Sequence, residues 1–171
     1  MFPKWQQTLE YPLKLYCLSG KVEDIPRLES DEYFIDKLTP DHAGFIGSYY
    51  KRINEDPAIV EKYFQYILIM YDTSAGIFKR SDPSYPIAWG VYGDLGKAIH
   101  LYSIPEHRGK GISSAVSRYL FTQLVQQAII PVVDRSIDSE MSDSNFARHM
   151  LHYATDRAWR DSTTGKCCWL Y

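Results

Sequence analysis

One short stretch, residues 101–114, constrains the fold of this chain more than any other. It reads LYSIPEHRGKGISS, which predicts the end of a strand, a tight basic loop and the first turn of a helix. Gly109 and Gly111 remove the Cβ atoms that would keep a ligand away from the backbone. Main-chain N–H groups at such a helix start bind phosphate or diphosphate, with Arg108 and Lys110 adding charge. The loop alone fits an ordinary strand-to-helix turn equally well.

The composition is that of a globular domain without a strong charge bias. Its 171 residues and 45% hydrophobic content are enough for one domain with a substantial core. Lys and Arg together number 19 against 21 Asp and Glu, and the net charge of −2 argues against a nucleic-acid partner. Any anion site must therefore be local.

Cysteine and histidine usage favours a reduced, intracellular protein, cytoplasmic or mitochondrial. The three cysteines, Cys17, Cys167 and Cys168, make no disulfide framework. The five histidines lack the pairing with cysteines that zinc sites show, so we expect no metal. The longest apolar run, residues 63–71, is far shorter than the ~20 residues of a membrane helix, so we expect no membrane partner.

Hydrophobic patterns along the chain predict strands interleaved with helices. Strands are expected over 11–18, 33–38, 68–73, 86–92, 98–104, 129–134 and 166–171, and helices over 42–53, 56–67, 112–127 and 145–158. A polar connection containing Gly76, Pro83 and Pro86 joins the third strand to the fourth. Residues 1–30 form an N-terminal extension and 31–171 the main domain. From residue 33 the order β-α-α-β-β-β-α-β-α-β predicts a mixed α/β fold with an antiparallel meander and a βαβ-like back half.

The loop and this order of elements resemble the GNAT superfamily of acyl-CoA-dependent N-acyltransferases. The superfamily's signature is Arg/Gln-x-x-Gly-x-Gly/Ala, and residues 108–113 match it except that Ser113 stands at the final small position. The resemblance implies a mixed, mostly antiparallel sheet with helices on both faces. It also implies acetyl-CoA or another acyl-CoA as donor, and direct attack by an amine without an acyl-enzyme.

Within the superfamily, the chain resembles the C-terminal domain of glycine N-acyltransferases. Residues 41–43, 86–89, 104–108 and 144–147 carry this likeness, which runs from about residue 33 to the C-terminus. Long relatives have an N-terminal half that this chain mostly lacks. They also place a glutamate, taken as the general base, just after the glycine corresponding to Gly96, where this chain has Lys97. A charged lysine cannot accept a proton from the amine, so either another group serves as base, or the chemistry is weak, or the substrate differs.

The resemblance assigns the donor site residue by residue. The diphosphate of CoA would be held by Arg108, Gly109, Lys110, Gly111, Ile112, Ser113 and Ser114. Backbone groups of Leu101 and Ser103 would meet the pantetheine arm along a strand splayed from its neighbour at Pro131; routine sheet pairing is the alternative. Asn145 would bond the same arm, or else cap its helix.

Three residues are candidates for proton transfer. By resemblance Tyr153 would protonate the leaving thiolate, since a phenol is protonated at neutral pH; it could equally be one core tyrosine among 14. His100 is the first candidate for a replacement base, because the ordinary pKa of histidine lies near 6.5, and Asp134 is a further candidate. A structural, half-buried histidine is the competing interpretation. In a regular strand His100 would face away from Leu101 and Ser103.

These residues together predict an acyl-CoA-dependent N-acyltransferase. The acceptor would be a small-molecule amine, and by resemblance an amino acid such as glycine. Two alternatives stay open: a catalytically weak acyl-CoA-binding or interaction domain, and a protein N-acetyltransferase. A homodimer is also left open.

Overall fold

The computed structural model describes residues 13–18, 21–25, 27–50, 56–93 and 96–136. Its centre is a four-stranded antiparallel sheet in the order β2-β3-β4-β5, and β1 and β6 form a separate antiparallel pair. The strands are β1 Leu13–Cys17, β2 Tyr33–Asp36, β3 Ser74–Lys79, β4 Asp82–Gly93, β5 Lys97–Ser103 and β6 Val132–Ser136. The helices are α1 Ala43–Ser48, α2 Pro57–Tyr71 and α3 Ile112–Gln126, with 3-10 turns η1 Val22–Asp24, η2 Pro40–His42 and η4 Pro105–His107.

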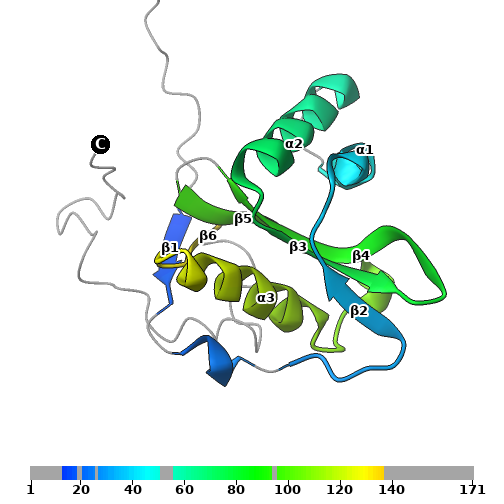
Figure 1. Ribbon diagram of the computed structural model, residues 1–171. Helices are drawn as coiled ribbons and strands as arrows, with labels where there is room; N and C mark the ends of the chain where they lie inside the picture. The colour runs from blue at the N-terminus through cyan, green and yellow to red at the C-terminus, as the bar shows by residue number, and fades with distance from the viewer. Residues whose placement is uncertain (1–12, 19–20, 26, 51–55, 94–95, 137–171) are drawn as a thin grey trace, which may run out of the picture.

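Helices cover both faces of the four-stranded sheet, with α1 and α2 on one side and α3 on the other (Figure 1). The predicted mixed α/β fold, its meander of β3, β4 and β5, and its helices on both faces are therefore confirmed. The predicted order holds from β2 to β6. The helix expected over 145–158 and the strand over 166–171 lie outside the described residues.

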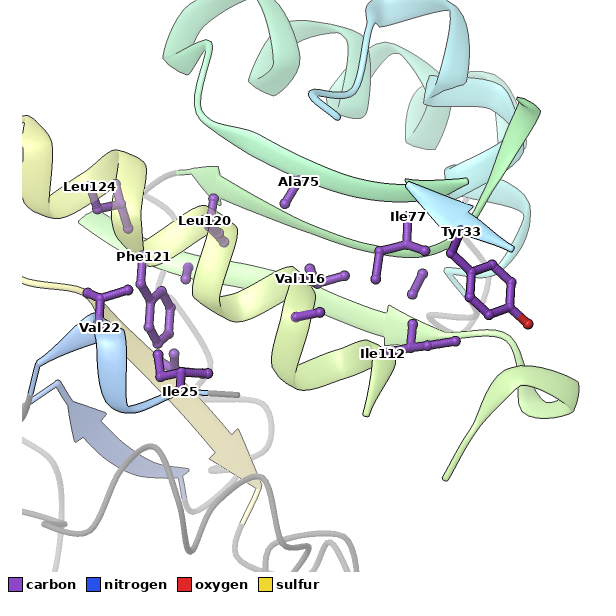
Figure 2. Packing of buried hydrophobic residues seen from close by; sticks show 14 of the residues in the cluster. Val22, Ile25, Tyr33, Ala75, Ile77, Ile112, Val116, Leu120, Phe121 and Leu124 are labelled. Carbon is purple, nitrogen blue, oxygen red and sulfur yellow. The ribbon is translucent and has the colours of Figure 1, made fainter. Parts of the chain in front are cut away.

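The core under α3 joins the sheet to the N-terminal segment. In Figure 2, Val116 and Leu120 lie between α3 and the strands that carry Ala75 and Ile77. Val22 and Ile25 close the far end of this cluster against Phe121. Arg118 of α3 donates to the backbone carbonyls of Glu23 and Ile25. These contacts attach the N-terminal segment to the helix that follows the glycine loop.

The core under α1 and α2 is aromatic. Phe64 and Trp89 are almost completely buried, and the Trp89 ring lies 5.4 Å from Tyr49 and 5.1 Å from Tyr102 between ring centroids. Rings at such separations contribute packing energy beyond the area they bury. This face of the sheet is consequently built from side chains of fixed orientation.

The strand predicted over 68–73 is wrong, because α2 continues to Tyr71. Asp56 caps the helix by accepting from the Ala58 N–H at 2.9 Å, and Pro57 takes the first helical position. The helix ends at Asp72, whose φ of +43° is left-handed. Val60, Phe64, Ile67 and Leu68 are buried on one helical stripe. The apolar residues from 68 onward therefore continue the buried face of α2, and the next strand begins at Ser74.

The polar connection predicted between these strands is also wrong, because most of it is strand. Gly76 lies in β3, where an added Cβ would come within 2.7 Å of the Leu38 side chain. Pro86 stands in β4 opposite Phe78, at a shift in register where the ladder is irregular. A proline is tolerated at such an irregularity because its missing N–H is not needed there.

The remaining differences are at element ends. The first helix, expected over 42–53, is α1 over only six residues, Ala43–Ser48. The strand expected over 129–134 begins later, at Val132, after Ala128 has turned the chain with a φ of +59°. The carbonyl of Pro131 accepts from the Leu18 N–H at 3.0 Å. The strands predicted over 11–18, 33–38, 86–92 and 98–104 and the helix over 112–127 are confirmed in substance.

His42 supplies a pH-dependent contribution to folding. Its Nδ1 accepts from the Thr39 N–H at 2.9 Å, and burial lowers the pKa of the His42 imidazole. The unfolded chain therefore binds this proton more readily, so stability is complete above about pH 6.5 and is lost as the pH falls through the depressed folded pKa. We expect urea unfolding between pH 7.5 and 5 to show a shallower pH dependence for His42→Asn than for the parent chain. Equal slopes would contradict the assignment.

Candidate functional site

The loop between β5 and α3 has the open, glycine-based form that the sequence predicts. Gly109 and Gly111 have φ values of +78° and +74°, and Gly111 is the N-cap of α3. Only glycine adopts this left-handed conformation without strain. Apart from their immediate chain neighbours, no described residue has a heavy atom within 4 Å of a Cβ built on either glycine. The backbone is therefore open above both residues.

The amides of this loop are available to a ligand. Within the described residues, none of the N–H groups of 109–114 donates to a main-chain carbonyl. The first hydrogen bond of the helix runs from the Ala115 N–H to the Gly111 carbonyl at 3.1 Å. Ser103 Oγ and Ser113 Oγ lie 2.8 Å apart, which ties the end of β5 to the start of α3. The helix start therefore offers consecutive N–H donors at the positive end of its dipole.

Two cations and a histidine surround the loop. Arg108 Nε donates to the Ser103 carbonyl at 3.1 Å, and its guanidinium lies 5.5 Å from the centre of the Tyr102 ring. Lys110 Nζ donates to the Tyr33 hydroxyl at 3.3 Å, and that hydroxyl lies 3.4 Å from Nδ1 of His107. Figure 2 shows the Tyr33 ring at the end of the core nearest Ile112, the first residue of α3.

The local charge bears on His107 itself. Burial, followed by the nearby cations Lys79 and Lys110, lowers the pKa of the His107 imidazole, against a smaller opposing effect of Glu32 and Glu106. The imidazole therefore favours its neutral form beside a loop that already carries positive charge. Tyr33 could not be recognised from the sequence as a partner of this loop, because 77 residues separate it from Lys110.

Strand β5 has an outer edge next to the loop. It pairs with β4, whereas β6 pairs with β1 in the other sheet. The Ile104 N–H donates to the Ile87 carbonyl on β4 at 2.9 Å. Since backbone groups alternate in direction along a strand, those of Ser103 are directed away from β4. This agrees with the expected splay between the strand of Leu101 and Ser103 and the strand that follows Pro131.

A β-bulge in β5 determines where His100 lies. Trp89 pairs with Tyr102 and Val91 with Ile99, so Gly90 is opposite both His100 and Leu101. His100 has a φ of +54°, which is unusual for a residue with a side chain. Leu101 contacts the α3 side, where its Cδ1 would lie 3.1 Å from a Cβ on Gly90.

The His100 imidazole lies on the opposite side, against α2 and the segment that follows α1. Its Nε2 lies 3.2 Å from the Tyr63 hydroxyl, and its ring centroid is 4.8 Å from Tyr50 and 4.9 Å from Phe64. The bulge therefore keeps His100 on the face away from Leu101 and Ser103, although the strand is irregular. Tyr63 was seen in the sequence only as a helical core residue.

The cleft on this face adjoins the same strand. It is an open hollow of about 560 Å³, lined by Ser48 and Tyr49 at the end of α1, Tyr102 of β5, and the segment Ile104, Pro105 and Glu106. Pro105 and Glu106 belong to η4, which leads directly into Arg108 and the glycine loop.

Other predicted site residues lie elsewhere. Asn145 and Tyr153 are outside the described residues. Lys97 opens β5, pairs with Gly93 and is only 4% exposed. Among the residues that the structure describes, no group of three His, Cys, Asp or Glu side chains is arranged to hold a metal ion. Nor does any described helix combine the length and apolar character needed to span a membrane.

Comparison with known proteins gives likeness at the level of structure. No family model and no curated protein matches the sequence. A Drosophila protein is similar with a TM-score of 0.63 at 19% identity, over 80% of this chain and 46% of that one. A GNAT-family acetyltransferase from Colwellia psychrerythraea has a TM-score of 0.60 at 11% identity, over 82% and 51%. A Staphylococcus epidermidis protein of unknown function has a TM-score of 0.54 at 12% identity, over 77% and 53%.

The chain thus spans about half the length of the solved structures it matches. At sequence identities this low, the structural likeness shows the fold alone. The four-stranded antiparallel sheet with its helices is the part of this chain that matches the fold of these structures. This chain has the fold of the GNAT family of acetyltransferases.

Proposed function

We propose that this protein binds an acyl-CoA, with acetyl-CoA as the simplest donor, and transfers the acyl group to the nitrogen of an amine. One feature carries the proposal: the loop of residues 108–113, with its available amides and left-handed glycines, opens α3 within a GNAT fold. A diphosphate is the ligand that such donors at a helix start suit best.

The donor site follows the loop and then the edge of β5. The amides of 109–114 would hold the diphosphate, and Arg108 and Lys110 would add positive charge. The outward N–H of Ser103 would meet the pantetheine arm, in the space where β5 and β6 belong to different sheets, while the Ser103 carbonyl accepts from Arg108. The arm would then run along β5 toward the bulge at His100 and Leu101.

The chemistry needs one group that takes a proton and one that gives it. The amine nitrogen attacks the thioester carbonyl carbon, a C–N bond forms, and the C–S bond breaks. The amine's proton passes to the His100 imidazole, whose Nε2 neighbours the Tyr63 hydroxyl at 3.2 Å. The CoA thiolate takes its proton from Tyr153, an assignment that comes from sequence resemblance alone.

The alternatives differ in what they require of His100. A catalytically weak acyl-CoA-binding domain would need the loop but no base. The pairing of half-buried His100 with a tyrosine hydroxyl, at a strained position in the strand beside the donor site, supports an enzyme instead. The sequence resemblance favours glycine or another amino acid as the acceptor. The alternative acceptor is an amino group of a protein, at its N-terminus or on a lysine.

Calorimetric titration with CoA and acetyl-CoA, followed by thiol release over a panel of amines, tests the proposal directly. We expect both nucleotides to bind and thiol release to require an amine. We expect Arg108→Ala to weaken donor binding by about tenfold, since it removes one charge-assisted contact. Absence of CoA binding by the parent chain would overturn the proposal.

A glycine substitution tests whether the loop itself holds the donor. Gly111→Ala places a side chain at a φ of +74°, which costs about 1 kcal/mol of stability and displaces the amides. We expect weaker acetyl-CoA binding and a lower midpoint of thermal unfolding. The matched control is Gly44→Ala in α1, where the nearest atoms to a new Cβ are those of the Glu61 side chain at 3.4 Å. If both variants bound acetyl-CoA equally, the loop would not be the site.

Replacing His100 separates binding from turnover. His100→Gln is expected to lower turnover by about 10²-fold or more through loss of the general base, while acetyl-CoA binding stays within about threefold. Tyr63→Phe, which keeps the ring and removes only the hydroxyl, should lower turnover less. His42→Asn, at η2, serves as the histidine control. Full turnover by His100→Gln would exclude His100 as the base.

A further inference from the structure

We infer that the acceptor is a primary amine carried by a flat, apolar body without a carboxylate, such as an arylalkylamine, and that the cleft between α1 and η4 binds that body. The inference rests on the proposed function, because it gives the chemical class of the acceptor. It comes from the shape, walls and charge of the cleft.

The cleft and His100 are linked through neighbouring residues of the segment after α1 and of β5, and His100 itself does not line the cleft. The lining residue Tyr49 is followed in the chain by Tyr50, whose ring centroid is 4.8 Å from that of His100. Tyr102, also in the lining, is two residues beyond His100 on β5. A molecule bound in the cleft with its nitrogen toward Tyr50 would thus approach the bulge of β5 from the face opposite Leu101.

The walls of the cleft suit an aromatic or other flat apolar group. Tyr49 and Tyr102 are 5.5 Å apart between ring centroids and tilted by 45°, and Trp89 packs against both. Ile104 and Pro105 continue this surface. The two tyrosine rings pack against the buried Trp89, so they already have their positions before the acceptor binds, and binding costs less conformational entropy.

The charge of the cleft selects against an acid. Glu106 is the charged side chain among the described residues that line it. Its carboxylate attracts an ammonium group and repels the carboxylate of a free amino acid. The guanidinium of Arg108, which lies over Tyr102, would be matched by the diphosphate of the bound donor.

The size of the cleft points the same way. About 560 Å³ is within the range of sites that enclose drug-sized ligands. Glycine would fill little of this space and contact few of the apolar walls, so it would gain little from them. An acceptor with a ring and a short amine arm matches both the walls and the volume.

Matched acceptors test the inference with acetyl-CoA fixed as donor. Phenethylamine and phenylalanine share the ring and the amine and differ in the carboxylate. We expect kcat/KM for phenethylamine to exceed that for phenylalanine and for glycine by about tenfold or more, because walls and charge act together. Calorimetry of phenethylamine in the presence of CoA gives the same comparison without turnover.

Two variants address the walls and the charge separately. Tyr49→Ala should raise the KM for phenethylamine roughly five- to tenfold while leaving the affinity for acetyl-CoA unchanged. Glu106→Gln should narrow the preference for phenethylamine over phenylalanine by about fivefold. Tyr66→Ala is the matched control, because Tyr66 lies on α2 with 49% of its surface exposed and outside the cleft.

The outcomes distinguish the two proposals. If acetyl-CoA binds and glycine or phenylalanine is the better acceptor, the inference fails and the proposed function stands. If acetyl-CoA binds and Tyr49→Ala affects phenethylamine no more than Tyr66→Ala does, the cleft is not the acceptor site. If CoA does not bind, both proposals fall together.

Discussion

Strand β5 is hydrogen-bonded to a neighbour on one side, and the arrangement of the candidate site depends on that. A second partner along its outer edge would consume the backbone groups at Ser103 and close the space before β6. Among the described residues, β6 pairs with β1 instead, and no strand pairs with this edge of β5. The core under α3 connects the two sheets, since Val133 of β6 packs in the same cluster as Ala98 of β5. An unpaired edge inside a well-packed domain is a place where a ligand can supply the missing contacts.

The bulge in the same strand places Leu101 on one face of the sheet and His100 on the other. On one side, Leu101 joins the core under α3, and Ser103 bonds to Ser113 at the start of the helix. On the other side, His100 contacts the rings of Tyr63 and Phe64 of α2 and of Tyr50, which follows α1. A donor along the edge and an acceptor over the aromatic face would then meet at a single point of the strand. Proximity of this kind is the main demand of acyl transfer between two bound substrates.

The sequence was sufficient for the order of elements and for the loop, because these depend on local signals. Asp56-Pro57 marks the start of α2, and the paired glycines mark the turn before α3. It was not sufficient where packing overrides a local pattern. Gly76 and Pro86 look like loop residues, yet they lie in strands because Leu38 packs closely over one and a register shift accommodates the other.

Contacts between distant segments were beyond prediction for the same reason. The expected position of His100 depended on a regular strand, and no residue pattern announces a bulge. Tyr63 and Tyr33 are ordinary apolar positions of a helix and a strand when seen in sequence. Only the folded chain brings their hydroxyls to His100 and Lys110. What could be anticipated was therefore the backbone of the donor site, and what could not was the set of side chains around it.

The short turn η4 has a consequence for how the molecule responds to change. Its three residues, Pro105–His107, separate the aromatic cleft from the glycine loop, and they belong to the surroundings of both. Under the proposed function, both substrates would therefore bind next to this one short segment of backbone. Under the proposed function, a substitution in this turn would change the binding of donor and acceptor together, so the two specificities could not change independently there.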